Sequence, residues 1–250
     1  MKNVRAKKHL GQHFLNDEKI ALDITNLLSN EAKNVVEIGP GMGVLTQYLV
    51  KKDYKTEVVE IDRESVFYLR LNYTDLEIYE GDFLQLDLKE QYPYNFSLIG
   101  NFPYNISSQI LFKAFKNRDQ IPEVVGMFQK EVAERIACKK GKKRGILSVF
   151  LQAFYDIEYC FTVDEHVFNP PPKVKSGVIK LVRNSRKELP VDEKKFKRVV
   201  KAGYNQRRKT LKNAMKPFEI INENEIADLL ALRAEQLSVD DFIKLTNHVR

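Results

Sequence analysis

The chain has 250 residues, a formal net charge of +7 and two cysteines. It contains no long apolar run, and its basic start lacks the apolar core of a secretory signal, so neither a membrane span nor export is expected. Cys138 and Cys160 are far apart and the four histidines lack metal-ligand spacing, which predicts a reduced, cytoplasmic protein without a metal site. We also expect a monomer.

Lysine and arginine residues gather in three segments of the chain. These segments are Lys2–Lys8, Lys139–Arg144 and Lys194–Lys212. A single basic cluster is usually a solvated surface, but three of them on a positively charged chain favour a polyanionic partner. The charge pattern therefore predicts a nucleic-acid-binding protein.

The first part of the chain is expected to lead into a ligand-binding loop. Residues 1–16 are predicted to form a basic extended arm, and an amphipathic helix follows behind Asp17. The apolar run 34–38 is typical of a buried parallel strand and leads into Gly39-Pro-Gly41-Met-Gly43, with a helix expected over 44–50. Glycines let a ligand approach the backbone closely, and Val44 replaces the third glycine of a dinucleotide fingerprint. The loop therefore predicts a nucleoside site without a pyrophosphate.

Acidic residues end the next two predicted strands. Glu60 closes a strand expected over 56–61, where a carboxylate can accept hydrogen bonds from both ribose hydroxyls. Asp62 is a weaker candidate for the same role. Asp82 follows a third strand over 76–79 and could accept a hydrogen bond from an adenine amino group, with Phe83 beside the ring.

The segment Asn101-Phe102-Pro103-Tyr104 follows an apolar strand over 96–100. The Asn101 side chain and the carbonyl of Phe102 or Pro103 can each accept one N–H from an exocyclic amino group, and Tyr104 can stack on the base. Pro103 fixes its own φ angle and so restrains the acceptors. This segment predicts a site for a planar base at the carboxyl edge of a sheet.

The remaining pattern predicts more of the sheet and then a helical region. Helices are expected over 106–116 and 130–137, strands over 123–128 and 178–182, the last strand closing the sheet, and a stiff loop over 167–174 that presents Phe168. The apolar segment 145–155 could be a helix or a strand, and its length favours a helix. A polar linker spans 184–190, and helices are expected over 191–202, 205–216, 223–232 and 239–248. We therefore predict an α/β Rossmann-like domain over 1–184, with helices on both faces of its sheet, and a small all-α domain over 185–250.

The assembled motifs resemble those of the ribosomal RNA adenine N6-dimethyltransferases. The segments that carry the resemblance are GQHFLN, EIGPGMG, VVEID, EGDF, NFPYNIS, VFNPPPKVKSG and YNQRRKTLKNA, in the order found in that family. The resemblance runs from about residue 5 to the C-terminus and is greatest to the bacterial branch that modifies adjacent adenines in a hairpin of small-subunit rRNA during ribosome biogenesis. The family usually has leucine in place of Phe102 and often asparagine in place of His13.

The resemblance implies a class I methyltransferase fold, S-adenosyl-L-methionine as donor, small-subunit rRNA as partner, and a role for each matching residue. The donor would be bound by His13, Leu15, Gly39, Gly41, Glu60, Asp82 and Asn101. The target adenine would stack between Tyr104 and Phe168, with Asn101 between donor and target. Arg207, Arg208 and Lys209 match a basic motif expected to contact rRNA.

Three other interpretations make different demands on the sequence. A large-subunit rRNA dimethyltransferase of the macrolide-resistance type shares the catalytic motifs but usually lacks a run like Arg207–Asn213. A DNA adenine methyltransferase would usually carry Asp-Pro-Pro-Tyr or Asn-Pro-Pro-Tyr and a base-reading domain. A non-catalytic ribosome-assembly factor would not need the glycine loop, Glu60 or Asn101.

Overall fold

The computed structural model describes residues 4–250, so the basic residue Lys2 lies outside the described part of the chain. The chain divides into two compact units, Met1–Ala133 with Ile157–Arg183, and Glu134–Asp156 with Asn184–Arg250. The sequence-based division at 184/185 differs in one respect, since residues 134–156 group with the C-terminal helices. Phe150 of this segment packs against Phe196, with ring centroids 6.3 Å apart.

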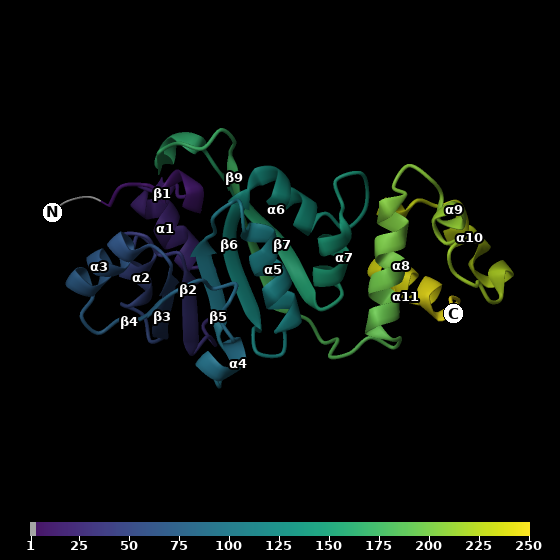
Figure 1. Ribbon diagram of the computed structural model, residues 1–250, viewed down its shortest axis with the longest axis horizontal. Helices are drawn as coiled ribbons and strands as arrows, with labels where there is room; N and C mark the ends of the chain where they lie inside the picture. The colour runs from purple at the N-terminus through teal and green to yellow at the C-terminus, as the bar shows by residue number, and fades with distance from the viewer. Residues whose placement is uncertain (1–3) are drawn as a thin grey trace. The chain divides into compact units, whose positions relative to one another are not determined.

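The first unit is built on a seven-stranded sheet in the order β4-β3-β2-β5-β6-β9-β7 (Figure 1). Its strands are β2 (Asn34–Ile38), β3 (Lys55–Glu60), β4 (Glu77–Glu80), β5 (Ser97–Asn101), β6 (Glu123–Gln129), β7 (Tyr155–Val163) and β9 (Ser176–Arg183). The strands from β4 to β6 pair in parallel, and β9 runs antiparallel to β6. Two short strands, β1 (Phe14–Leu15) and β8 (Phe168–Asn169), pair separately.

Both faces of the central strands are buried, as expected for a Rossmann-like sheet. Val35 of β2 and Ile99 of β5 belong to a core cluster with Ile24 of helix α1 (Glu18–Thr25). Their chain neighbours Val36 and Leu98 point to the opposite face and are also fully buried. The other helices of this unit are α2 (Thr46–Leu49), α3 (Arg63–Asn72), α4 (Leu88–Gln91), α5 (Ser107–Lys116) and α6 (Lys130–Ala137), whose end lies in the second unit.

The prediction that residues 178–182 close the sheet is wrong, although the strand itself is confirmed. β9 lies between β6 and β7, and β7 forms the edge of the sheet. The sequence analysis missed β7, although its residues alternate between exposed and half-buried from Asp156 to Tyr159, which is typical of a strand with one solvated face. The central strands are instead continuous apolar runs.

The second unit is helical. Its helices are α7 (Ile146–Gln152), α8 (Glu193–Asn205), α9 (Leu211–Ala214), α10 (Ala227–Ala231) and α11 (Val239–Asn247), with 3₁₀ turns at Glu223–Ile226 and Ala234–Gln236. The predicted continuous helix over 205–216 is wrong, because α8 ends at Asn205 and residues 206–210 form a turn. Lys209 donates its backbone N–H to the Gln206 carbonyl at 2.8 Å, and Thr210 is extended at the start of α9.

Candidate active site

A pocket lies at the carboxyl ends of β2, β3 and β5, where the strand order reverses between β2 and β5. This is the position at which open α/β sheets bind ligands. The pocket is lined by the glycine loop, by Glu60 and Asp82, by the segment 101–106 and by residues 9–15 of the N-terminal arm. The sheet topology thus brings together five segments of the sequence predictions that are far apart in the chain.

The glycine loop forms the floor of the pocket in a conformation that requires glycine. Gly39, Gly41 and Gly43 have φ angles of 65°, 58° and 82°. A Cβ atom on Gly41 would lie 2.7 Å from the ring of Phe14, so the glycine also lets the arm approach the loop. Helix α2 begins at Thr46, two residues later than the sequence predicted.

Glu60 is 3% exposed and both of its carboxylate oxygens are positioned by backbone N–H groups. Oε2 accepts from Gly41 at 3.0 Å and Oε1 accepts from Asp62 at 2.8 Å. Burial raises the pKa of this carboxyl, and the backbone hydrogen bonds oppose that effect. Each oxygen retains a lone pair that can accept from a ribose hydroxyl.

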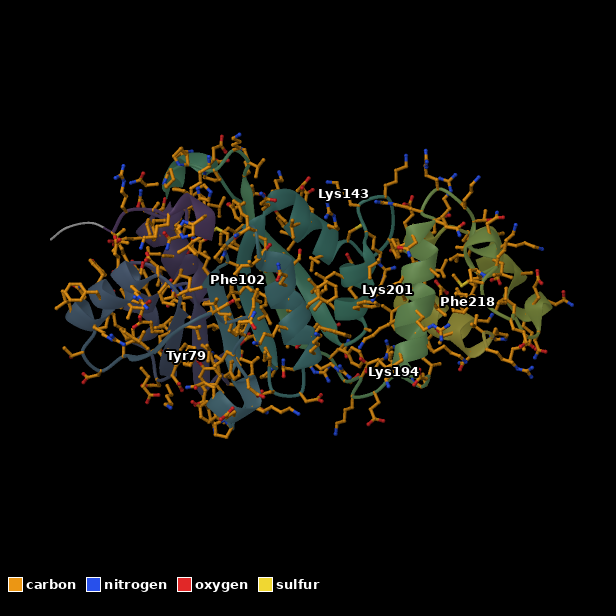
Figure 2. All side chains as sticks on the ribbon, in the orientation of Figure 1. Tyr79, Phe102, Lys143, Lys194, Lys201 and Phe218 are labelled. Atoms are coloured by element: carbon orange, nitrogen blue, oxygen red, sulfur yellow. The ribbon has the colours of Figure 1, made fainter. Side chains whose placement is uncertain are left out.

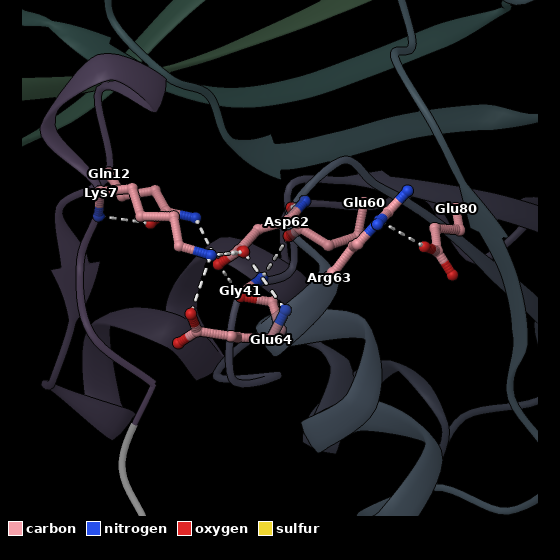
Figure 3. Close-up of polar contacts among 9 residues, drawn as sticks. Lys7, Gln12, Gly41, Glu60, Asp62, Arg63, Glu64 and Glu80 are labelled. Carbon is pink, nitrogen blue, oxygen red and sulfur yellow. Dashed lines mark hydrogen bonds and ion pairs between the residues drawn. The ribbon is translucent and has the colours of Figure 1, made fainter.

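Asp62, the weaker ribose candidate, is already engaged by other groups (Figure 3). Its carboxylate pairs with Lys7, accepts from Gln12 Nε2 at 3.2 Å and from Ser65 Oγ at 3.0 Å, and caps α3 through Glu64 N. The structure therefore uses Asp62 to join the arm to α3. Asp82 lies on the pocket wall, where its Oδ1 accepts from Leu84 N at 2.8 Å and Oδ2 remains as an acceptor.

Asn101 lines the pocket and is held there by the arm. Its Nδ2 donates to the His13 carbonyl at 2.9 Å, so Oδ1 is left as an acceptor. The His13 ring stacks on Tyr104 with centroids 5.6 Å apart, and His13 Nδ1 lies 2.7 Å from the Pro170 carbonyl. The Tyr104 hydroxyl forms a 2.6 Å hydrogen bond with Ser176. The amide and the aromatic ring are therefore both fixed.

Three predicted site residues have side chains in the core. Phe102 is 1% exposed and packs edge-on against Phe128, so only its backbone can act in the pocket. Leu15 is buried but also lines the pocket. The prediction that the loop presents Phe168 is wrong. This ring is 3% exposed in the same core cluster as Leu15, because β8 pairs with β1 and draws the ring inward.

Two residues of this region were missed by sequence reasoning. Glu37 lines the pocket, is fully buried and accepts a 2.6 Å hydrogen bond from Thr46 Oγ1. Its signal was an acidic residue inside an otherwise apolar strand. Lys113 donates to the carbonyls of Phe83, Leu84 and Leu86 and so restrains the loop after Asp82. A lysine in the amphipathic helix 106–116 gave no such signal.

The predicted RNA-binding residues lie in the second unit, in the turn between α8 and α9. All three residues are exposed, and Arg207 Nε also donates to Glu235 Oε2 at 2.8 Å. Lys194 and Lys201 project from α8 in the same unit (Figure 2). Within residues 4–250 there is neither a group of side chains placed to hold a metal ion nor a helix long and apolar enough to cross a membrane.

Comparison with known proteins agrees with this arrangement. The sequence model of the ribosomal RNA adenine dimethylase family matches residues 3–249. The chain is 61% identical to a ribosomal RNA small subunit methyltransferase A of Cytophaga hutchinsonii, over 99% of this chain and 98% of the relative. It is 57% identical to the protein of that name from Bacteroides thetaiotaomicron, over 100% and 96% of the two chains.

Solved structures have the same fold. The crystal structure of a dimethyladenosine transferase from Plasmodium falciparum matches with a TM-score of 0.81 at 26% identity, covering 95% of this chain and 99% of the other. The 23S rRNA methyltransferase ErmE matches with a TM-score of 0.76 at 21% identity, over 94% and 99% of the chains, which bears on the fold alone. From the family match and the identity to its relatives, this chain belongs to the ribosomal RNA adenine dimethylase family.

Proposed function

We propose that this protein transfers methyl groups from S-adenosyl-L-methionine to N6 of two adjacent adenines in a hairpin loop of small-subunit rRNA. The observation that carries the proposal is the Asn101 amide, which His13 holds in a fixed orientation beside the Tyr104 ring. Support for the small subunit comes from the names of the relatives that are 61% and 57% identical.

The pocket residues fit S-adenosyl-L-methionine. The buried Glu60 carboxylate retains lone pairs for two ribose hydroxyls, and Asp82 Oδ2 can accept from the adenine amino group. The glycine loop, with its positive φ angles at Gly39 and Gly41, leaves room for the ligand beside the backbone. When bound, the cofactor supplies an electrophilic methyl group on a sulfonium.

The protein's own contribution is to orient the adenine amino group. Asn101 Oδ1 accepts one N6 hydrogen, and a backbone carbonyl accepts the other, which turns the nitrogen lone pair out of conjugation with the ring. The Pro103 carbonyl already accepts from Ile106 N at 3.1 Å, so the Phe102 carbonyl is the preferred second acceptor. The methylated nitrogen is acidic and loses its proton to water or to a carbonyl, so no histidine or cysteine base is assigned.

The target base must leave its stack to reach the pocket, at a cost of about a few kcal/mol. Stacking on an aromatic side chain contributes about 1–3 kcal/mol per base and offsets this cost. Tyr104 lines the pocket and is the residue to which we assign stacking. A stacking role for Phe168 remains a prediction that requires its ring to leave the core.

Contact with the rRNA backbone is assigned to the second unit. Arg208 and Lys209 are exposed in the turn after α8 and can reach phosphates, whereas Arg207 is paired with Glu235. Phosphate contacts give affinity without base specificity, so the selection of the two adenines belongs to the pocket. We propose the helical unit as the rRNA-binding part of the chain.

The test is transfer of radiolabelled methyl groups to small ribosomal subunits from a strain that lacks this modification, followed by nucleoside analysis. The expected product is N6,N6-dimethyladenosine. Label found only on naked large-subunit rRNA would favour the macrolide-resistance type. Absence of labelling together with absence of donor binding would favour an assembly factor without catalysis.

A further inference from the structure

The N-terminal arm forms one wall of the donor pocket. Residues His9 to Leu15 all line it, and the Phe14 ring lies against Gly41 of the glycine loop. A nucleoside donor bound in this pocket would lie against the arm. The contacts that hold the arm in place therefore bear on donor exchange.

The arm is folded into a compact loop before it reaches the pocket. The Lys7 backbone N–H donates to Gln12 Oε1 at 2.8 Å, and a 3₁₀ turn at Lys8–Leu10 ends at Gly11 in the left-handed region. Lys7 and Gln12 are thus joined to each other, and their remaining polar groups point to the same carboxylate (Figure 3).

That carboxylate is Asp62, whose side chain is 1% exposed. Lys7 Nζ pairs with Oδ1 and Gln12 Nε2 donates to Oδ2 at 3.2 Å, while Lys7 Nζ also lies 3.2 Å from Glu64. The backbone N–H of Asp62 donates to Oε1 of Glu60, the proposed ribose ligand, at 2.8 Å. One residue therefore joins the arm to the group that binds the ribose.

The charge of the buried Asp62 carboxylate makes its contact with the arm sensitive to the loss of Lys7. Burial by itself would raise the pKa of Asp62, but the hydrogen bonds from Lys7, Gln12 and Ser65 lower it below its usual value. The carboxylate is therefore charged and buried, and removing its cationic partner leaves a poorly compensated charge. Water can solvate the Asp62 carboxylate again most readily if the arm moves away from it.

We propose that Lys7 and Gln12 are positioning residues that hold the arm over the donor pocket and align Glu60 through Asp62. This inference rests on the proposed function, in which the pocket binds S-adenosyl-L-methionine. In the protein the Lys7–Asp62 pair acts as a clasp. It sets how long the donor stays bound, and it takes no part in methyl transfer itself.

The test compares donor binding and exchange by the full chain in the absence of RNA. Lys7→Gln is expected to weaken S-adenosyl-L-methionine binding by about tenfold, which corresponds to about 1.4 kcal/mol, mainly through faster dissociation. The KM for the donor rises accordingly. The kcat at saturating donor stays within about twofold, since bound donor keeps the arm closed in both proteins.

Matched variants distinguish the effect of breaking the Lys7–Asp62 pair from a general effect of lost charge or lost stability. Lys19→Gln removes one positive charge from an exposed position of α1 and should leave donor dissociation unchanged. Lys7→Arg keeps the charge and should restore most of the affinity. Asp62→Asn retains a residue that caps α3 well, so it should reproduce the Lys7→Gln effect without unfolding the helix, and the double variant should add little.

The proposal is wrong if Lys7→Gln and Asp62→Asn both release the donor as slowly as the wild type does. It is also wrong if Lys7→Gln and Lys19→Gln lose the same amount of donor affinity. If either clasp variant melts well below the wild type, Gln12→Leu, which leaves the ion pair intact, replaces it, and unchanged dissociation there also overturns the proposal. A wild-type protein that binds no donor would contradict the proposed function instead. The two failures are therefore distinguishable.

Discussion

The donor pocket and the turn over 206–210 are both assigned to one reaction on RNA, yet they are built in opposite ways. In the pocket, the polar side chains are held by other parts of the chain, as Asn101 is by the His13 carbonyl and Tyr104 by Ser176. In the turn, Arg208 and Lys209 are exposed between two helices. The fixed groups are those to which we assign contact with the target adenine.

The difference follows from what each region has to do. Methyl transfer depends on alignment of the reacting atoms, so it falls steeply when a group shifts by a fraction of an ångström. Phosphate binding depends on the number of charges released from counterions and tolerates side-chain motion. Substitutions in the pocket should therefore have large effects on turnover, and substitutions in the turn should have graded effects that depend on salt.

The largest effect is expected from Asn101→Ala. Removing a preorganised polar group at the reacting atom should lower methyl transfer by at least about a hundredfold, while donor affinity changes little. Single-turnover transfer to small subunits and calorimetry with the donor measure the two quantities. Asn72→Ala is the control, because it removes a side-chain amide that also donates to a carbonyl, at 2.7 Å, but outside the pocket. Unchanged turnover in Asn101→Ala would exclude the proposed N6 contact.

The support beneath Asn101 can be tested through Gly126→Ala. A Cβ atom at this position in β6 would lie 2.2 Å from the Phe102 ring, so the variant should lose about 1–3 kcal/mol of stability and displace the 101–104 segment. Phe102→Leu removes the clashing ring atoms and should recover part of the loss in the double variant. Denaturant unfolding of the two single variants and the double variant measures the coupling. Strictly additive losses would show that the ring and the glycine are not coupled.

Local patterns in the sequence were enough to predict much of the pocket. The apolar strand, the glycine loop and the acid at the end of the next strand can each be recognised from a few consecutive residues. The positive φ angles at Gly39 and Gly41 agree with the predicted glycine loop. The order of the strands in the sheet was not predicted, and the one statement made about it, that residues 178–182 close the sheet, is wrong. The family resemblance contributed the role of the arm, which no local pattern indicated.

What the sequence could not provide were contacts between distant segments. The burial of Phe168 follows from pairing between β8 and β1, about 150 residues apart in the chain. Asp62 looked like a second ribose ligand because it follows Glu60, but Lys7 and Gln12 occupy its carboxylate. Arg207, Arg208 and Lys209 are alike in sequence, and only the position of Glu235 distinguishes the first of them.

A titration test on the Glu37 carboxyl shows whether the interior of the pocket is closed to water. Burial raises the pKa of the Glu37 carboxyl to about 8, and the nearby Glu60 charge adds to this effect against the hydrogen bond from Thr46. Because the folded pKa exceeds the unfolded value of 4.5, the contribution of Glu37 to stability is fully present below pH 4.5 and is lost as pH rises through about 8.

Glu37→Gln keeps an acceptor for Thr46 and removes the titration. The variant should therefore be more stable than the wild type above pH 8, by on the order of a few kcal/mol, with the difference shrinking toward pH 4.5. Chemical unfolding of both proteins across this pH range measures the difference. A difference that does not change with pH would show that Glu37 remains ionised in the folded protein, and that the pocket interior is open to water.

The smallest effect separates two arginines of the same turn. Arg208→Gln should weaken binding to small-subunit rRNA a few-fold and lower the slope of log affinity against log salt by about 1, because an exposed phosphate contact is lost. Arg207→Gln should instead lower the melting temperature, since Glu235, which is 8% exposed, loses its cationic partner. Filter binding at several salt concentrations and thermal unfolding test both variants. If the Arg207 variant lowers the salt slope as much as the Arg208 variant without changing the melting temperature, Arg207 binds phosphate directly. The contrast between fixed and exposed groups would then not extend into this turn.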